Sequence, residues 1–261
     1  MRRAFLGAVT IFVAGVLAGP ALADSTLVER AFTRGNERYL QGDYPGAIDE
    51  YRSAGPASEG SAALSFNLGN AYLKAGEVAR AIASYERARS LAPRDPDVAY
   101  NLTHAKELIG RTYGDEILRQ NEEIAATFDS PLARLTSGEI TAAFAALYLP
   151  FGALLVAWAL TRSRLLGRAA LGFGAAALAT GLALAAHHYL YDRVARAVLV
   201  GGVVDIKSGP DDRYTTTFTV HEGLLVRVEE GRGDWYRVQL ANGLVGWVPE
   251  SRMAWVRRPV G

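Results

Sequence analysis

A period of 34 residues constrains this chain more than any other feature of its sequence. Small residues and a tyrosine recur at this spacing: the first copy has Gly35, Gly42, Ala47, Tyr51 and Ala54, and the second has Gly69, Gly76, Ala81, Tyr85 and Ala88. A fixed period of roughly 20–50 residues is typical of a solenoid of stacked helical units. Small side chains are needed where two helices cross closely, and glycine suits a left-handed turn between helices. We therefore expect two helix pairs, over residues 28–60 and 62–95.

The second copy also has a recognisable motif. Its segment NLGNAYLKAGEVARAIASYERARSLAP, which begins at Asn67, closely resembles the tetratricopeptide repeat (TPR). A third copy, PDVAYNLTHAKELIG, begins at Pro96, but no second helix of the same type follows it. We interpret residues 96–110 as a capping helix, which a short solenoid needs to cover its last apolar face. The resemblance thus implies an α-helical TPR solenoid over residues 24–110 that binds another protein.

In TPR arrays the first helix of each pair lines a concave groove, and the resemblance assigns that groove a set of polar side chains. The candidates for protein binding there are Asn36, Asn67, Asn70, Lys74, Asn101 and His104. Amide groups can donate to and accept from an extended peptide backbone, so a peptide-binding groove is one interpretation. The alternative is that the asparagines only bridge adjacent helices. No second ligand faces His104 at helical spacing, so we expect no metal site and no cofactor.

The N-terminus has the pattern of a secretory signal. Arg2 and Arg3 precede an apolar run over residues 4–17, and the small-residue triplet Ala-Leu-Ala ends at Ala23. We predict a signal peptide over residues 1–23, with cleavage after Ala23; an uncleaved anchor is the alternative. A cleaved signal would place the repeats in the periplasm.

Two apolar segments, residues 139–161 and 169–191, follow a helical connector over residues 111–138 that contains DEILRQNEEIAATF. Each is long enough to cross a hydrocarbon core about 30 Å thick, so we predict a two-helix transmembrane hairpin. The four-residue spacing of Ala177, Gly181 and Ala185 forms a smooth ridge, which we expect to pack on the first span. We expect His187, beside Tyr189 and Tyr191, to belong to an aromatic belt at the membrane surface.

The loop between the two spans, residues 162–168, contains three arginines and no acidic residue. By the positive-inside rule this loop is cytoplasmic. Both flanking domains would then be periplasmic, which is where the signal sequence also places the repeats. We therefore expect a protein of the bacterial inner membrane with two spans and periplasmic N- and C-terminal domains.

The C-terminal part changes to short alternating runs separated by turns, which is the pattern of an all-β domain. The segments KSGPDDRY, FTVHEGLLVRV, DWYRVQL and NGLVGWVPESRM resemble a bacterial SH3 domain over residues 197–257. The resemblance implies an SH3-like β-barrel that binds either protein segments or cell-wall peptides. We expect Trp235 and Trp247 in its core. The candidates for binding lie in the loop that faces ligand in SH3 domains: Asp211, Asp212 and Tyr214.

Composition and motifs exclude several classes of function. The chain has no cysteine, so it has no disulfide framework and no cysteine nucleophile. A net charge of +1 argues against nucleic acid as the main partner. Motifs of serine hydrolases, zinc proteases and P-loop enzymes are absent, and the four histidines offer little for acid–base catalysis. We therefore expect a protein that is not an enzyme.

The order of the parts is itself informative. A signal peptide, TPR units, a two-span hairpin and a C-terminal bacterial SH3 domain resemble the BatE-like proteins of bacterial aerotolerance (Bat) operons. This likeness implies a non-catalytic scaffold in an envelope complex linked to stress or aerotolerance. Its partners would be von Willebrand A-domain Bat proteins and, indirectly, a MoxR-type AAA+ ATPase. The alternative is an envelope protein that binds peptidoglycan through the SH3-like domain and recruits a cell-wall enzyme through the repeats.

Overall fold

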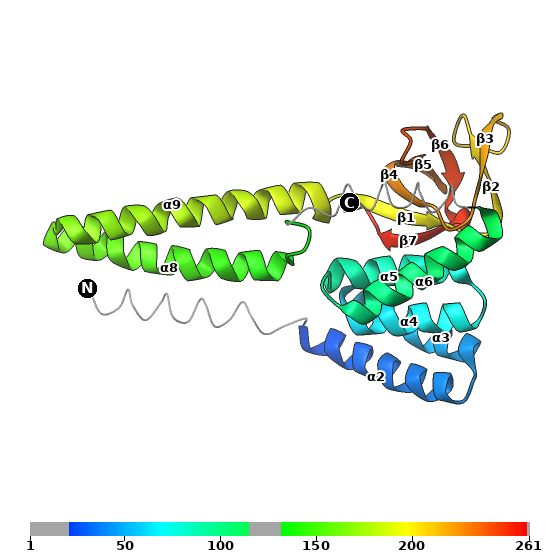
Figure 1. The fold of residues 1–261 in the computed structure, drawn as a ribbon, viewed down its shortest axis with the longest axis horizontal. Coiled ribbons are helices and arrows are strands. Elements are labelled where there is room, and N and C mark those ends of the chain that lie inside the picture. Colours follow the sequence, from blue (N-terminus) through cyan, green and yellow to red (C-terminus); the bar gives the residue numbers. More distant parts are fainter. Residues whose placement is uncertain (1–20, 115–131, 260–261) are drawn as a thin grey trace.

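The computed structural model describes residues 21–114 and 132–259 of the 261-residue chain. Most of the predicted signal peptide and the connector helix predicted over residues 115–128 lie outside the described residues. The helical repeats and the C-terminal sheet pack against each other, and a long helical hairpin projects from this body (Figure 1). The sheet and the hairpin are adjacent in sequence, whereas the sheet and the repeats are not.

The repeat region consists of five α-helices and one 3-10 segment within the described residues. In chain order they are α2 (Ala21–Leu40), α3 (Tyr44–Arg52), η1 (Gly55–Gly60), α4 (Ala62–Lys74), α5 (Val78–Leu91) and α6 (Pro96–Tyr113). The turns inside both helix pairs contain the expected left-handed glycines, Gly42 with a φ of +77° and Gly76 with a φ of +82°. Ser61 and Asp95 cap α4 and α6 through their side-chain oxygens. These contacts explain where α4 and α6 begin and where the chain turns within each helix pair.

The recurring glycine and tyrosine form one packing contact in each repeat. A Cβ added to Gly69 would lie 2.5 Å from Cε1 of Tyr85, and one added to Gly35 would overlap the ring of Tyr51. Both tyrosines are almost fully buried. The period therefore arises because each first helix needs a glycine where the tyrosine ring of its second helix lies against it.

The hairpin consists of α8 (Ser137–Thr161) and α9 (Arg164–His187), followed by one π-helical turn, η2 (His188–Asp192). Thr136 and Glu139 form a complete capping box at the start of α8. The helical stretches Ser137–Thr161 and Arg164–Tyr191 are long and apolar enough to cross a membrane, with mean hydropathies of 2.0 and 1.8, and very little of either stretch is buried inside the protein. An apolar surface of this length is unusual for a protein that is entirely in water.

The contact between α8 and α9 repeats every seven residues. Phe151 lies over Gly174, and Trp158 lies over Gly167; a Cβ on these glycines would come within 2.8 and 2.9 Å of the rings. One heptad earlier in α8, Phe144 lies 3.2 Å from the Cβ position of Gly181. The predicted ridge spaced by four residues is therefore only partly correct, because Ala185 is exposed. A contact stripe that averages 3.5 residues per turn stays on one face of each helix, as in a coiled coil.

The C-terminal part forms one antiparallel sheet with the strand order β3-β2-β6-β5-β4-β1-β7. The strands are β1 (Ala195–Leu199), β2 (Val203–Lys207), β3 (Thr216–His221), β4 (Leu225–Arg232), β5 (Trp235–Gln239), β6 (Val245–Pro249) and β7 (Met253–Arg257). The order begins at β3 and ends at β7, so the structure shows an open sheet, and the barrel implied by the family likeness stays a prediction. Its core is formed by the inward side chains of β1, β2 and β4, among them Val198, Ile206 and Val226.

The sheet and the repeats share one hydrophobic core, although the sequence analysis treated these two regions as separate domains. Helix α5 packs on β7 and β1, and buried residues of both regions form one continuous cluster. Arg87 of α5 donates from Nε to the Val256 carbonyl at 3.2 Å and also to the Trp255 carbonyl. At the other end of the contact, the ring of Tyr113 stacks on His221 with 4.7 Å between centroids. The edge strand β7 is thus covered by a helix, which protects it from pairing with another chain.

Candidate functional site

The four asparagines expected in the concave groove form two hydrogen-bonded bridges between successive first helices. Asn36 Oδ1 accepts from Tyr51 Oη at 2.7 Å and from Asn67 Nδ2 at 2.9 Å. One repeat later, Asn70 Oδ1 accepts from Tyr85 Oη at 2.8 Å and from Asn101 Nδ2 at 2.9 Å. The structure therefore contains the bridging contacts that the second interpretation of these asparagines expects. Their binding of a partner stays a proposal.

The bridges also explain why the tyrosines of the repeat keep a hydroxyl group. Burial raises the pKa of Tyr51 to about 12, with a further contribution from Tyr39, against the lowering effect of the Asn67 hydrogen bond. Burial likewise raises the pKa of Tyr85. Both hydroxyls therefore remain protonated donors at physiological pH, and a buried donor needs the acceptor that Asn36 or Asn70 supplies.

The rest of the groove is open to solvent. Lys74 at the end of α4, and Tyr100 and His104 on α6, are exposed, with Tyr100 73% accessible. Within residues 21–114 and 132–259, no group of three or more His, Cys, Asp or Glu side chains is placed to hold a metal ion. Lys74 and His104 are therefore the members of the predicted groove set that a partner could contact without displacing a bridge, and Tyr100 is exposed on the same helix as His104.

The predicted binding loop of the C-terminal sheet lies between β2 and β3 and is held by its own contacts. Asp211 accepts from Arg213 Nε at 3.0 Å and from its terminal nitrogen at 2.9 Å. The side-chain hydrogen bond from Arg213 is the main reason why the pKa of Asp211 is lowered to about 2. Asp212 and Tyr214 are exposed, and the Tyr214 ring lies against Gly209. Asp211 is therefore engaged inside the loop, and Asp212 and Tyr214 are its accessible members.

Tryptophans of this region mostly belong to its interior. Trp247 is buried, with the Arg232 guanidinium 5.4 Å from its ring centroid. Trp235 is half-buried at the start of β5. Trp255 is buried at the contact with the repeats, where its Nε1 donates to Glu250 at 2.9 Å. The core position predicted for Trp247 is confirmed.

Comparison with known families gives a match in each of the two regions. Residues 38–106 match the tetratricopeptide repeat. Residues 201–254 match the bacterial SH3 domain. A search of curated proteins gives no significant match. Domains of these two kinds are typically non-catalytic and suggest binding of protein or peptidoglycan; the matched ranges contain all the predicted binding residues except Asn36.

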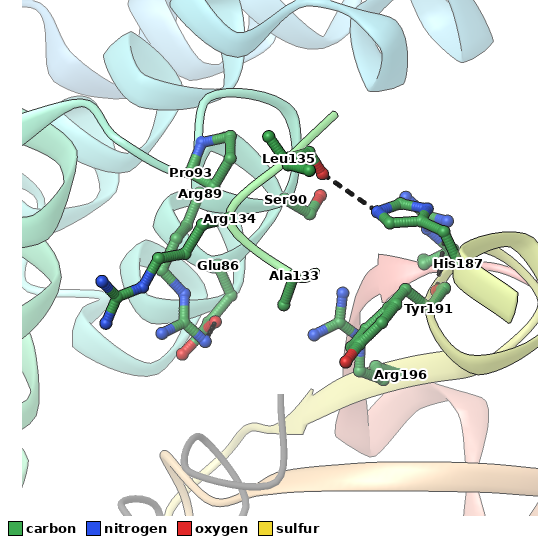
Figure 2. A pocket seen from close by; sticks show the side chains of 11 residues that line it. Glu86, Arg89, Ser90, Pro93, Ala133, Arg134, Leu135, His187, Tyr191 and Arg196 are labelled. Atoms are coloured by element: carbon green, nitrogen blue, oxygen red, sulfur yellow. Dashed lines mark hydrogen bonds and ion pairs between the residues drawn. The ribbon is translucent and has the colours of Figure 1, made fainter. Parts of the chain in front are cut away.

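A charged junction, which sequence analysis did not predict, joins the TPR domain, the SH3 domain and the base of the hairpin (Figure 2). Glu86 of α5 is fully buried; its Oε1 accepts from Lys106 at 2.8 Å, and its Oε2 lies 2.8 Å from Arg89. Burial by itself would raise the pKa of Glu86, but Lys106, Arg89 and Arg196 together lower it to about 2. Three cations from α5, α6 and β1 thus hold one buried carboxylate in its charged form.

His187 anchors the hairpin to this junction. It is buried rather than placed in a surface aromatic belt, and its Nε2 lies 3.0 Å from the Leu135 carbonyl (Figure 2). Its ring also lies 5.1 Å from that of Tyr191, whose carbonyl accepts from Arg257 of β7 at 3.3 Å. Arg94 at the end of the repeats pairs with Glu139 at the start of α8. Contacts from both domains therefore fix the end of the hairpin that meets the body.

Proposed function

We propose that this protein is a membrane-anchored, non-catalytic scaffold that binds other proteins through periplasmic TPR and SH3 domains. The observation that carries the proposal is the arrangement of two binding domains as one packed unit at the base of an apolar hairpin. A unit of this kind can present two binding surfaces in a constant geometry next to a membrane. The arginines of the loop between α8 and α9 support a cytoplasmic turn and periplasmic domains.

The likeness to BatE-like proteins supplies candidate partners. We propose that the protein assembles with von Willebrand A-domain Bat proteins and, through them, with a MoxR-type AAA+ ATPase. The exposed groove residues Lys74, Tyr100 and His104, and the loop residues Asp212 and Tyr214, are the contact candidates. The matched SH3 family also supports the alternative that Tyr214 and its neighbours contact peptidoglycan.

Partner capture by the full-length protein tests this function. The chain, tagged after Gly261 and extracted in a mild detergent, is expected to co-purify with a von Willebrand A-domain protein encoded beside it. Lys74→Glu with His104→Ala should reduce that capture, whereas Arg30→Glu on the exposed surface of α2 should not. Binding of the wild type to purified cell-wall sacculi without any protein partner would instead favour the peptidoglycan alternative.

Membrane orientation needs a separate test. A reporter that fluoresces only in the cytoplasm should stay dark when fused after Gly261 and become bright when inserted between Arg164 and Leu165. The opposite pattern would contradict the proposed orientation, although it would leave the binding function open.

A further inference from the structure

The contact between the TPR and SH3 domains leaves a cleft that neither domain contains alone. It has a volume of about 370 Å³ and opens between the helices α3, α4 and α5 on one side and the edge strand β7 on the other. This cleft is separate from the concave groove, because Arg80, Ala83 and Arg87 on its wall belong to a second helix of the repeat. A volume in this range is typical of sites for small ligands or a few residues of a peptide.

The charge of the cleft is its main chemical property. Four arginines line it, Arg52, Arg80, Arg87 and Arg258, together with one acidic residue, Glu59. We call this site the arginine cleft. Its positive charge is local, because the whole chain has a net charge of only +1.

Some of these arginines already interact with other groups of the protein. These partners distinguish the arginines that stabilise the fold from those that are available to bind an anion. Arg87 binds the β7 carbonyls, Arg80 pairs with Glu77, and Arg258 lies 2.9 Å from Glu250 and 5.2 Å over the Trp255 ring. Arg52, at the end of α3, is exposed, and the contacts of the described residues include no acidic partner for it. Arg52 is therefore the guanidinium that can turn to an incoming anion at the least cost.

A neutral donor lies among these charges. Tyr72 is 7% exposed and lines the cleft, and Arg52, Arg80 and Arg87 all act electrostatically on its hydroxyl. Burial raises the pKa of Tyr72, so its hydroxyl keeps its proton. Leu68 and Met253 supply an apolar wall beside it. Guanidinium groups around a phenol, next to apolar surface, are suited to a carboxylate carried on a short aliphatic stem.

We propose that the arginine cleft binds an acidic segment of a protein partner, with a glutamate or aspartate carboxylate between Arg52 and the Tyr72 hydroxyl. Recognition of acidic motifs by clustered arginines is an established mode of peptide binding. Nucleic acid is disfavoured as the occupant, because the whole chain has a net charge of only +1. The proposal rests on the protein-binding function argued above, but it concerns a different face of the molecule from the groove and the β2–β3 loop.

A pair of matched peptides tests the proposal on the full-length protein in a neutral detergent. The probe is a fluorescent hexapeptide of alternating glutamate and glycine, and its control has glutamine in place of glutamate. We expect anisotropy to show binding of the glutamate peptide and at least tenfold weaker binding of the glutamine peptide. Arg52→Glu should weaken binding of the glutamate peptide at least tenfold, and Tyr72→Phe, which keeps the ring, about threefold to tenfold.

The control variant is Arg30→Glu, which makes the same charge change on the exposed surface of α2 and should alter affinity less than twofold. Equal losses in Arg30→Glu and Arg52→Glu would overturn the proposal, because the attraction would then be non-specific. Failure of the wild type to bind the glutamate peptide, or binding of purified cell-wall peptides alone, would also overturn it. Partner capture through the groove, measured on the Arg52→Glu variant, is independent of these outcomes, so the two proposals can fail separately.

Discussion

The repeats and the hairpin use the same contact, an aromatic ring over a glycine, in two different environments. In the repeats Tyr85 covers Gly69, and its hydroxyl donates to Asn70, so the ring contact is combined with a buried polar bridge. In the hairpin Phe151 covers Gly174 with no polar group on the ring, and the outward faces of both helices stay apolar and exposed. Burial from water therefore drives the first contact. The second depends on shape, because lipid is as apolar as the side chains.

The largest effect is expected at the charged junction, which has no counterpart along the hairpin. Glu86→Gln removes the negative charge that interacts with Lys106, Arg89 and Arg196, and breaking a buried ion pair in this way typically costs about 3–5 kcal/mol. Thermal unfolding of the full-length protein in detergent at pH 7 measures the loss. Glu107→Gln on the exposed side of α6 is the control and should change little.

The same carboxylate predicts a dependence of stability on pH. The folded-state pKa of Glu86, about 2, is below its ordinary value of 4.5, so its stabilising contribution is complete above about pH 5. This contribution is expected to disappear as the pH falls from about 5 to about 2. Wild type and Glu86→Gln should therefore converge in melting temperature at low pH; a constant difference between them would contradict the assignment.

A smaller loss is expected at the ring contact within the TPR domain. Gly69→Leu pushes a branched side chain into the Tyr85 ring and should cost about 1–3 kcal/mol or more. Limited proteolysis and circular dichroism of the full-length protein should show an unstable TPR domain. Ala63→Leu, on the exposed face of the same helix, is the matched control. A fragment ending before the hairpin is a poorer test, because it would uncover the face of α5 that packs on β7.

The corresponding substitution can be made at a ring contact in the hairpin. Gly174→Leu should separate α8 from α9 at a similar or lower cost, about 1–3 kcal/mol, whereas Gly172→Leu meets open space and should be tolerated. The chain has no cysteine, so the pair Leu154→Cys and Ala170→Cys, at positions between two of the ring contacts, reports helix contact by disulfide formation. We expect the cysteine pair to crosslink in the otherwise wild-type protein and in the protein that also carries Gly172→Leu. We expect the crosslink to be lost when the protein also carries Gly174→Leu.

The smallest effect distinguishes the two interpretations of the groove. Asn70→Ala leaves the Tyr85 hydroxyl without its acceptor and should lower stability by about 0.5–1.5 kcal/mol. Lys74→Ala, one turn later on the same helix and exposed, should leave the melting temperature unchanged. Weaker partner capture by Lys74→Ala would support a groove that binds through its exposed side chains. Weaker partner capture by Asn70→Ala at an unchanged melting temperature would instead support the interpretation that the asparagines contact the partner directly.

Much of the architecture could be predicted because it depends on contacts that are local or strictly repeated. The left-handed Gly42 and Gly76, the capping box at Thr136 and the glycines under Tyr51 and Tyr85 all follow from residue type and spacing. The heptad contact of the hairpin was predicted only in part, because a ridge of small residues indicates a smooth helix face without indicating which rings cover it. The signal for it was present, since Phe144, Phe151 and Trp158 are each seven residues apart.

The binding candidates show where sequence reasoning was incomplete. The asparagines were recognised, but the bridges between them depend on the distance between helices that are about 30 residues apart in sequence. Arg87 and Glu86 were not singled out, although α5 carries a second stripe of small residues, Ala79 and Ala83, on the face that leads to Arg87. A helix of an isolated repeat has no need for such a stripe, so it was a sign that another element packs there.

Patterns along the chain specify the parts of this protein: two helical repeats with a capping helix, two apolar helices joined by an arginine-rich turn, and a C-terminal antiparallel sheet. Each of these is set by the period of its side chains, by its turn residues and by its hydropathy, which are properties of short segments. Three features arise from tertiary packing alone: α5 covers β7, cations from three elements stabilise the Glu86 carboxylate, and an arginine-lined cleft opens between the two domains. These features depend on residues as far apart in sequence as Arg87 and Val256. Their contact arises because α5 packs on β7, and no local pattern along the chain indicates that packing.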